Sequence, residues 1–437
     1  MRAMKTTPLE NWIIQKSGIG EPSRERLCEY QLSRIRETLD YAKARSRFYA
    51  ERLKGICPDE ILTLDDMSKL PFTTPGDIRS DPFHFLCVPQ REIKRVVTLN
   101  TTGTSGKEKR VFFSEEDLDA TVEFFIYGMS CLTDNTDRVL VLLPGESRGS
   151  IGDLLKKALD RAGTDCVKHG IISDIDNVAK KIAEKDITSI VGIPSQLLKL
   201  SRTKSEVFGS RIKSVLLSAD YVPEALIREL TEKFRCKVFT HYGMTETGYG
   251  GGVECEARVG YHLREAELYY EIVDPVSGRP VPDGEWGEVV FTTLTRKAMP
   301  LIRYKTGDLA AFSTERCACG TFLKTMKRVK GRLSGGVVLE GDKRLYQSEL
   351  DELVLAFGEL RDYKASILRD GALQLEIVTE NEADFDKCRD KIEGVVRNFI
   401  HERSGSAVEL RVIRKTEADR LSNSMVKRTI VDLRKGD

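Results

Sequence analysis

Short apolar runs that alternate with amphipathic segments constrain the fold of this chain most strongly. The runs cover residues 139–143, 189–193, 214–218 and 237–242, and stretches with helical periodicity such as 151–162 and 223–234 separate them. A strand buried on both faces has a continuous apolar run, and such strands separated by helices are typical of βαβ units. The pattern predicts an α/β fold with a buried parallel sheet, whose ligands bind at the carboxyl ends of the strands.

The chain on either side of this region has other patterns. One helical face near the N-terminus contains Leu32, Ile35, Leu39 and Ala42. Residues 268–309 alternate short strand patterns with turns, which predicts a β-rich subdomain. The remaining segment mixes helices and strands, which predicts a small α+β domain. Because 437 residues exceed a typical single core, we predict a large N-terminal domain, 1–331, and a C-terminal domain, 332–437.

The charge balance and the lack of long apolar stretches exclude several classes of protein. Lys and Arg number 69 against 68 Asp and Glu, for a formal net charge of +1, so we expect no nucleic-acid partner. The sequence contains no apolar run long enough to span a membrane, and the first residues lack the apolar centre of a signal peptide. We therefore expect a cytoplasmic protein without a membrane partner.

A loop rich in Gly, Ser and Thr follows the strand pattern at 95–100. Its residues are Thr101, Thr102, Gly103, Thr104, Ser105, Gly106, Lys107, Glu108 and Lys109. Glycines let the backbone approach a phosphate closely, and hydroxyl groups, N–H groups and a Lys can then donate to its oxygens. It is not a Walker loop, because Glu108 follows Lys107 and a strand pattern comes next. An ordinary Gly/Ser/Thr turn is the alternative.

A second motif, His241-Tyr242-Gly243-Met244-Thr245-Glu246-Thr247, directly follows the last apolar run. Glu246 could bind Mg²⁺, which prefers carboxylate and phosphate oxygens. Thr245 could hold a phosphoryl oxygen, and Tyr242 could stack on a purine. The alternative is a turn at a strand end with an exposed Glu.

Two further motifs could hold a ribose. In Tyr304-Lys305-Thr306-Gly307-Asp308 the carboxylate of Asp308 could accept hydrogen bonds from both ribose hydroxyls, and an Asx turn at a strand end is the alternative. In Lys330-Gly331-Arg332 the guanidinium of Arg332 could bind ribose or phosphate, and a solvated surface Arg is the alternative.

These four motifs, in this order, resemble those of the acyl-adenylate-forming superfamily, and within it the phenylacetate-CoA ligases are the most similar branch. Further similar stretches are Lys69 to Thr74, Asp77-Ile78-Arg79, Asp81-Pro82, Glu254-Cys255, Gly260-Tyr261-His262, Arg296 to Asp308 and Cys317 to Gly320. The resemblance covers nearly the whole chain.

The resemblance implies ATP, Mg²⁺ and coenzyme A as ligands and a small carboxylic acid, such as an aryl-acetic acid, as substrate. It implies that residues 101–109 bind phosphate and that Thr245 and Glu246 bind the α-phosphate and Mg²⁺. The implied adenosine contacts are Ser218, Ala219, Asp220, Tyr242, Gly243, Met244, Asp308 and Arg332, and residues 191–195 would help to line the acyl pocket. The C-terminal domain would be mobile, and a homodimer would be usual for this branch.

Three of the ten cysteines lie near a histidine of the β-rich region. Cys255, His262, Cys317 and Cys319 offer three thiolates and an imidazole, which suits a closed structural zinc site. Similar positions in the resembling branch favour zinc, and the alternative is three reduced thiols and a hydrogen-bonded His. The other seven cysteines are interpreted as small buried apolar residues.

The chain departs from the family pattern at two places. Ser334 stands where the family usually has an acidic hinge residue, and Met425 stands where it has a catalytic Lys. Lys427 could serve instead if the segment shifts. Two alternatives to an acid–CoA ligase therefore stay open: an adenylyltransferase that does not use coenzyme A, and a nucleotide-binding protein without turnover.

Overall fold

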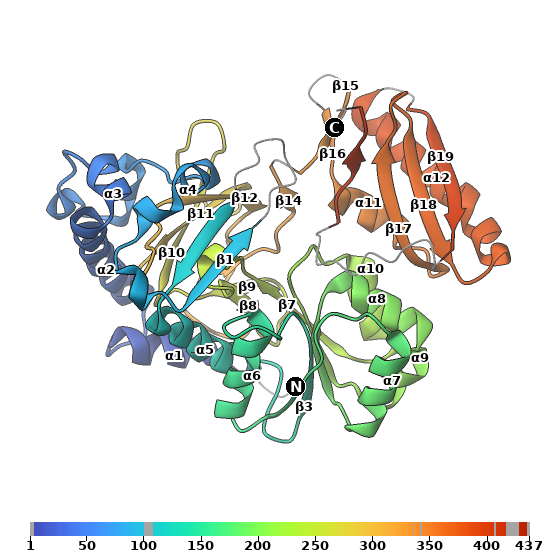
Figure 1. Cartoon of the computed structure of the whole chain (residues 1–437), viewed down its shortest axis with the longest axis horizontal. Coiled ribbons are helices and arrows are strands. Elements are labelled where there is room, and N and C mark those ends of the chain that lie inside the picture. The colour runs from blue at the N-terminus through green and yellow to red at the C-terminus, as the bar shows by residue number, and fades with distance from the viewer. Residues whose placement is uncertain are drawn as a thin grey trace. The chain divides into compact units, whose positions relative to one another are not determined.

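The protein forms two compact units, each built from several segments (Figure 1). The computed structural model describes residues 4–99, 108–333, 335–340, 343–405, 408–416 and 428–434. The first unit contains Met1–Thr136, Pro144–Lys168 and Phe239–Val329, and the second contains Asp137–Leu143, His169–Val238 and Lys330–Asp437. Because the second unit combines part of the parallel sheet with the C-terminal segment, the domain boundary between residues 331 and 332 stays a prediction.

The first unit combines helices with an antiparallel sheet. Its helices are α1 (Pro8–Ser17), α2 (Arg24–Arg45), α3 (Arg47–Arg52), α4 (Pro75–Ser80), α5 (Glu115–Met129) and α6 (Ile151–Arg161), with 3-10 turns η1 (Pro58–Glu60), η2 (Leu64–Lys69), η3 (Pro82–Phe85), η4 (Gln90–Glu92) and η6 (Thr245–Thr247). Its strands are β1 (Arg95–Leu99), β2 (Lys109–Phe113), β4 (Asp165–Lys168), β8 (Gly252–Glu254), β9 (Tyr261–Leu263), β10 (Leu268–Val273), β11 (Gly287–Thr293), β12 (Tyr304–Ala310) and β13 (Thr325–Met326).

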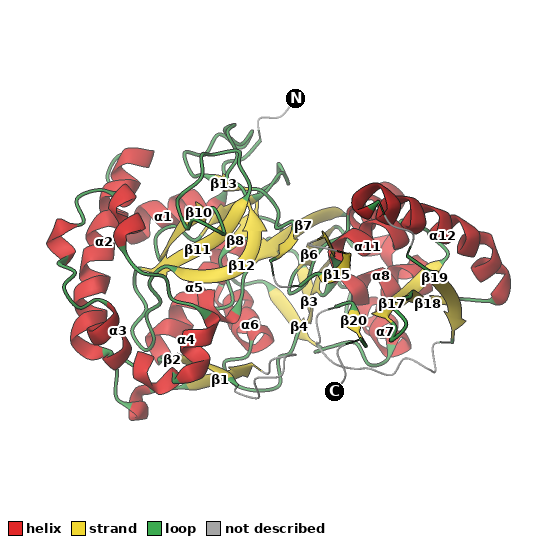
Figure 2. Ribbon diagram, turned by 90° about the horizontal axis from the view of Figure 1, so that it is seen from above, coloured by secondary structure: helices red, strands yellow, loops and turns green. Residues whose placement is uncertain are grey.

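The sheet β10–β11–β12 forms the centre of this β-rich region, and α2 lies along it (Figure 2). All residues of β11 are buried, and the α2 residues Gln31 and Thr38 donate hydrogen bonds to the carbonyls of Glu265 and Leu294. The helix forms because Ser23 caps its N-terminus and apolar residues recur along one face, including buried Leu27, Ile35 and Leu39.

The second unit contains parallel strands and a separate C-terminal sheet. Its elements are β3 (Arg138–Leu142), α7 (Ile175–Glu184), β5 (Ser189–Gly192), α8 (Pro194–Thr203), α9 (Ser205–Arg211), β6 (Ser214–Leu217), α10 (Glu224–Arg228), the π-helix η5 (Glu229–Lys233), β14 (Gly331–Arg332), β15 (Val337–Glu340), β16 (Lys343–Leu345), α11 (Gln347–Val354), β17 (Leu360–Ile367), β18 (Leu373–Thr379), α12 (Glu382–Ser404), β19 (Leu410–Lys415) and β20 (Val431–Asp432). Strands β3, β5 and β6 pair in parallel. The C-terminal strands have the order β19–β18–β17–β20, and α12 packs on β18 and β19. Strand β7 (Lys237–Tyr242) begins in the second unit and ends in the first.

The α/β fold class and the parallel strands are confirmed. The helical stretch predicted at 223–234 is confirmed, as α10 followed by a π-helix. The alternative of an Asx turn at a strand end is wrong for Asp308, which lies inside β12. Strand β4 was not predicted, because it begins and ends with charged residues, Asp165 and Lys168, and so contains no apolar run.

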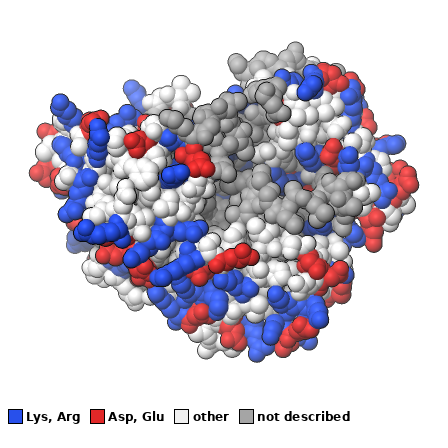
Figure 3. All heavy atoms as spheres, in the orientation of Figure 1, with Lys and Arg blue, Asp and Glu red and all other residues white. Residues whose placement is uncertain are grey.

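The surface agrees with the nearly neutral charge of the chain. Figure 3 shows basic and acidic side chains interspersed over the described part of one face. Among the described helices, none is long and apolar enough to cross a membrane. The interpretation of the seven scattered cysteines as buried residues is confirmed for Cys87, Cys236 and Cys388. It is wrong for Cys57, which is exposed, and Cys28, Cys131 and Cys166 are only partly buried.

Candidate active site

A tight turn after β7 places Glu246 inside the first unit. The turn η6 ends at Gly248, whose φ of 75° favours glycine, and the N–H of Gly248 donates to the carbonyl of Thr245 over 3.0 Å. Gly243 is required before the turn, because a Cβ there would lie 2.4 Å from the carbonyl oxygen of Tyr249. Glu246 is 3% exposed, so the alternative of an exposed glutamate is wrong.

Two side chains from other elements hold the carboxylate of Glu246. The ammonium of Lys109, at the start of β2, forms a close ion pair with Oε1 of Glu246, and the hydroxyl of Tyr304, at the start of β12, donates to the same oxygen over 2.8 Å. Burial raises the pKa of Glu246, but the charge and hydrogen bond of Lys109 and the hydrogen bond of Tyr304 lower it further, so the net shift is downward. The site therefore contains a buried carboxylate that is ionised.

A second pair brings the predicted purine and ribose residues together. The hydroxyl of Tyr242 donates to Oδ2 of Asp308 over 3.2 Å, although the two residues are 66 positions apart. The ring of Tyr242 lies 5.9 Å from that of Tyr261, and the N–H of Asp308 donates to Thr306 Oγ1 over 3.0 Å. Both members of the pair are buried, so Asp308 is oriented by its neighbours before any ligand binds.

Met244 precedes η6 in the same turn of the first unit. The remaining predicted nucleotide residues belong to the second unit or lie outside the described residues. Ser218, Ala219 and Asp220 directly follow β6, where Ala219 has a φ of 76° and Asp220 accepts a hydrogen bond from the N–H of Arg428 over 3.3 Å. Arg332 is exposed in β14, and residues 191–195 span the end of β5 and the start of α8. Residues 101–107, Ser334, Met425 and Lys427 are outside the described part of the chain.

Sequence reasoning gave no individual role to Lys109, Tyr304 or Arg296. The first two stand in motifs that were singled out, at the end of the Gly-rich loop and at the start of the Asp308 motif. Arg296 donates to the carbonyl of Glu246 over 2.9 Å. It lies in a stretch that resembles the family, but the pattern carries no signal for this contact, because it joins positions 50 residues apart.

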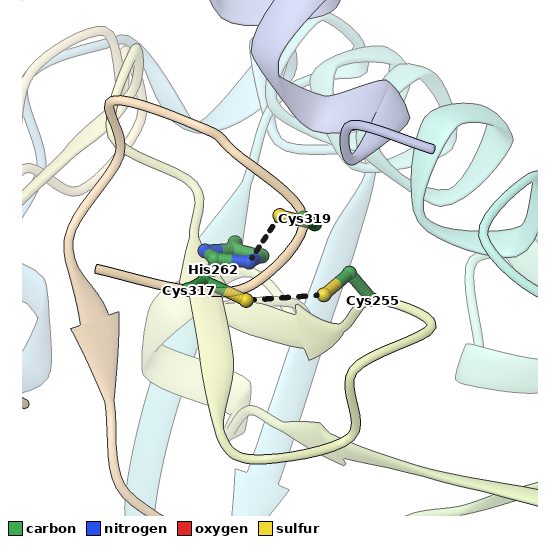
Figure 4. A group of neighbouring side chains, drawn as sticks. All are labelled: Cys255, His262, Cys317 and Cys319. Carbon is green, nitrogen blue, oxygen red and sulfur yellow. Dashed lines mark hydrogen bonds between the residues drawn. The ribbon is translucent and has the colours of Figure 1, made fainter. Parts of the chain in front are cut away.

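The four predicted zinc ligands converge in the first unit (Figure 4). Their ligand atoms all lie within 4.8 Å of one another, with Cys255 Sγ 3.5 Å from Cys317 Sγ and Cys319 Sγ 3.5 Å from His262 Nε2. Tetrahedral zinc with bonds of about 2.0–2.3 Å would separate its ligand atoms by roughly 3.5–3.8 Å. All four side chains are buried, and Nδ1 of His262 lies 3.4 Å from the carbonyl of Lys324, which can orient the ring.

Hydrogen bonds within this cluster set the protonation of its members. Hydrogen bonds from Cys255 and His262 lower the pKa of the Cys319 thiol despite its burial, and the hydrogen bond with Cys319 together with burial raises the pKa of Cys255. Burial lowers the pKa of His262, but hydrogen bonds with Cys317 and Cys319 raise it overall. A zinc ion would bind neutral imidazole and deprotonated sulfur, so its binding would release protons from His262 and from the thiols.

The fold and the site together define an α/β enzyme with a buried, ionised carboxylate on the turn that follows a central strand. The family model for AMP-binding enzymes matches residues 59–294, so the chain belongs to the family of AMP-binding enzymes. It is 29% identical to the phenylacetate-coenzyme A ligase of Thermus thermophilus over 80% of both chains, and 27% identical to that of Pseudomonas putida over 87% of both chains.

Solved structures agree on the fold. The 2-hydroxyisobutyryl-CoA ligase in the postadenylation state, in complex with R3-HIB-AMP, has a TM-score of 0.79 to this chain at 21% identity, over 94% of this chain and 90% of that one. The amide bond synthetase McbA from Marinactinospora thermotolerans has a TM-score of 0.52 at 17% identity, over 75% of this chain and 66% of that one.

Proposed function

We propose that this enzyme uses ATP to activate a small carboxylic acid, of the aryl-acetic type, as an acyl-adenylate and transfers the acyl group to coenzyme A in the cytoplasm. The observation that carries the proposal is the buried Glu246 carboxylate between Lys109 and Tyr304, in the same unit as the Tyr242–Asp308 pair. Relatives that are phenylacetate-coenzyme A ligases, similar over most of the chain, support the choice of substrate and acceptor.

In the proposed reaction the carboxylate of the acid attacks the α-phosphorus of ATP in line, and pyrophosphate leaves. Little covalent catalysis is needed, so the protein contributes mainly positioning and charge stabilisation. Thr245 would hold an α-phosphate oxygen, and Glu246 would bind Mg²⁺, which neutralises developing phosphate charge. The carboxylate of Asp308, oriented by Tyr242, would accept hydrogen bonds from the ribose hydroxyls.

The remaining roles follow from the motifs. The loop 101–107 would hold the β- and γ-phosphates, residues 218–220 would lie against the adenine, and Arg332 would contact the ribose. Lys427 would act on the adenylation step in place of the usual Lys, at whose position Met425 stands. The predicted C-terminal domain, 332–437, would move between the two half-reactions.

The test is pyrophosphate release from MgATP across a panel of carboxylic acids, with and without coenzyme A. We expect one aryl-acetic acid to release pyrophosphate and then to form a thioester when coenzyme A is added. Glu246→Gln should abolish release. The control Glu285→Gln, at an exposed carboxylate between β10 and β11, should not. If a stable adenylate forms and does not react with coenzyme A, the enzyme is an adenylyltransferase and not an acid–CoA ligase. If the protein binds nucleotide without turnover, both activities are refuted.

We also propose that Cys255, His262, Cys317 and Cys319 bind one structural zinc ion. The convergence of four buried ligand atoms supports this. Metal analysis of the purified protein should find about one zinc per chain, and removal by a strong chelator should lower thermal stability, because a structural zinc contributes folding free energy. Cys317→Ser should reduce the zinc content, and the matched control Cys236→Ser, at a buried thiol outside the cluster, should leave it unchanged. Full stability and no bound metal in the wild type would refute the proposal.

A further inference from the structure

A loop after β11 reaches the turn that carries Glu246. Arg296 in this loop donates from Nη1 to the main-chain carbonyl of Glu246 over 2.9 Å, while Lys109 and Tyr304 hold the side chain of the same residue. Main chain and side chain of Glu246 are therefore held by separate partners.

The end of the turn is shaped around this guanidinium. A Cβ at Gly248 would lie 2.8 Å from Nη2 of Arg296 and 3.1 Å from Oγ1 of Thr121. The Thr121 hydroxyl, on α5, donates to the carbonyl of Gly248 over 2.9 Å. Glycine ends the turn both because its φ is positive and because these two side chains occupy the adjacent space.

The loop that carries Arg296 is itself anchored next to the strand that carries Lys109. The carboxylate of Asp117, near the start of α5, accepts hydrogen bonds from the N–H groups of Lys297 over 2.8 Å and Ala298 over 3.1 Å. The guanidinium of Arg296 lies 5.0 Å from the ring centre of Phe113, the last residue of β2. Arg296 thus connects β2, which begins with Lys109, to the turn that carries Glu246.

The polar contacts of the Arg296 guanidinium are directed at the turn. Within the described part of the chain, Arg296 has this one hydrogen bond and no ion pair. Arg303, by contrast, is a fully buried arginine with an ion pair: it donates to both carboxylate oxygens of Glu271 over 3.1 and 2.9 Å. Arg296 also lines a cavity of about 230 Å³, together with Thr247, Arg264 and Glu267 among others.

We infer that Arg296 is a positioning residue for metal binding by Glu246, acting through the main chain of the turn. The inference rests on the proposed function, in which Glu246 binds the metal of MgATP. A carboxylate binds a metal with the required geometry only when its own position is held by surrounding hydrogen bonds. Without Arg296 the carbonyl of Glu246 loses a charge-assisted hydrogen bond, and the carboxylate gains positional freedom.

The test measures metal binding directly. Mn²⁺ replaces Mg²⁺, and its binding in the presence of α,β-methylene-ATP is followed by electron paramagnetic resonance for the wild type, Arg296→Ala and Arg296→Lys. We expect Arg296→Ala to weaken Mn²⁺ binding about tenfold, which corresponds to about 1.4 kcal/mol. Arg296→Lys should recover part of it, because an ammonium can still donate to one carbonyl. The control is Lys297→Met, at an exposed cation of the same loop, which should bind Mn²⁺ like the wild type.

The cavity permits a second readout. Because space next to Arg296 connects to the surface, guanidinium ions should restore Mn²⁺ binding in Arg296→Ala, and sodium chloride at the same ionic strength should not. Unchanged Mn²⁺ binding in Arg296→Ala would overturn the inference. A loss of thermal stability in both Arg296→Ala and Arg296→Lys that guanidinium ions do not restore would also overturn it. If the wild type binds no metal–nucleotide complex, the proposed function fails, which is a separate outcome.

Discussion

Replacing Lys109 by Met should destabilise the protein most at neutral pH. The substitution keeps an unbranched side chain of similar length. Among the described residues, it leaves the Tyr304 hydroxyl as the side-chain partner of the buried Glu246 carboxylate. Removal of one partner from a buried ion pair typically costs about 3–5 kcal/mol. Because the Lys109 side chain is 15% exposed and the Tyr304 hydrogen bond remains, we expect a loss near 3 kcal/mol.

The loss of stability caused by Lys109→Met should depend on pH. In the wild type the pKa of Glu246 is below its ordinary value of 4.5. The ionised carboxylate therefore contributes to the free energy of unfolding above pH 4.5, and this contribution is lost as the pH falls through the pKa of the folded state. Without Lys109, burial dominates and raises the pKa of Glu246 instead. A protonated carboxyl group needs no cation, so the difference in stability between Lys109→Met and the wild type should shrink as the solution becomes acidic.

The assay is urea denaturation without nucleotide or metal, at neutral and at acidic pH. The matched control is Arg110→Met, which removes the next cation along β2, whose ion pair with Glu108 is exposed and worth at most about 1 kcal/mol. Glu246→Gln combined with Lys109→Met should recover part of the loss, because no buried charge remains. Equal effects of Lys109→Met and Arg110→Met, or a loss that does not change with pH, would refute the argument.

Two other pairs in the first unit lead to predictions of different kinds. Arg303→Met should lower the free energy of unfolding by about 3 kcal/mol in urea denaturation, because Glu271, whose pKa burial raises even beside Arg303, is left buried without its cation. The double variant with Glu271→Leu should recover part of the loss, since the carbonyls of Ser68 and Leu70 still lack their donor. An Arg303→Met protein as stable as the wild type would contradict this. Tyr242→Phe removes the hydrogen bond to Asp308, so the KM for ATP should rise about fivefold, for about 1 kcal/mol, with a smaller change in kcat. An unchanged KM would show that Tyr242 does not orient Asp308 for the nucleotide.

Local pattern was sufficient for much of the architecture. The apolar runs predicted β3, β5, β6 and β7 because strands buried on both faces require them. The Gly-rich loop was placed between two strand patterns, and β1 and β2, the strands before and after it, pair antiparallel. The position of the Glu246 motif directly after β7 also followed from the sequence, since strand ends are marked by neighbouring residues.

Burial and long-range pairing could not be predicted in the same way. In the sequence, position 246 was compatible with an exposed turn and with a buried site. The structure shows that it is buried, because Lys109 of β2 and Tyr304 of β12 contact the Glu246 carboxylate. The sequence did not indicate that the helical stretch at 223–234 continues from α10 into the π-helix η5, because its periodicity is that of an ordinary helix.

The fold class, the order of the motifs and the family resemblance could be read from the sequence, because they depend on residues that are close along the chain, and the resemblance also brought the four zinc ligands together. The fold was needed to show that Glu246 is buried beside a cation, that Arg296 holds its main chain, and that Tyr242 donates to Asp308 across 66 positions. These contacts arise from the way strands and loops pack, and side chains that meet through packing have no fixed spacing in the sequence.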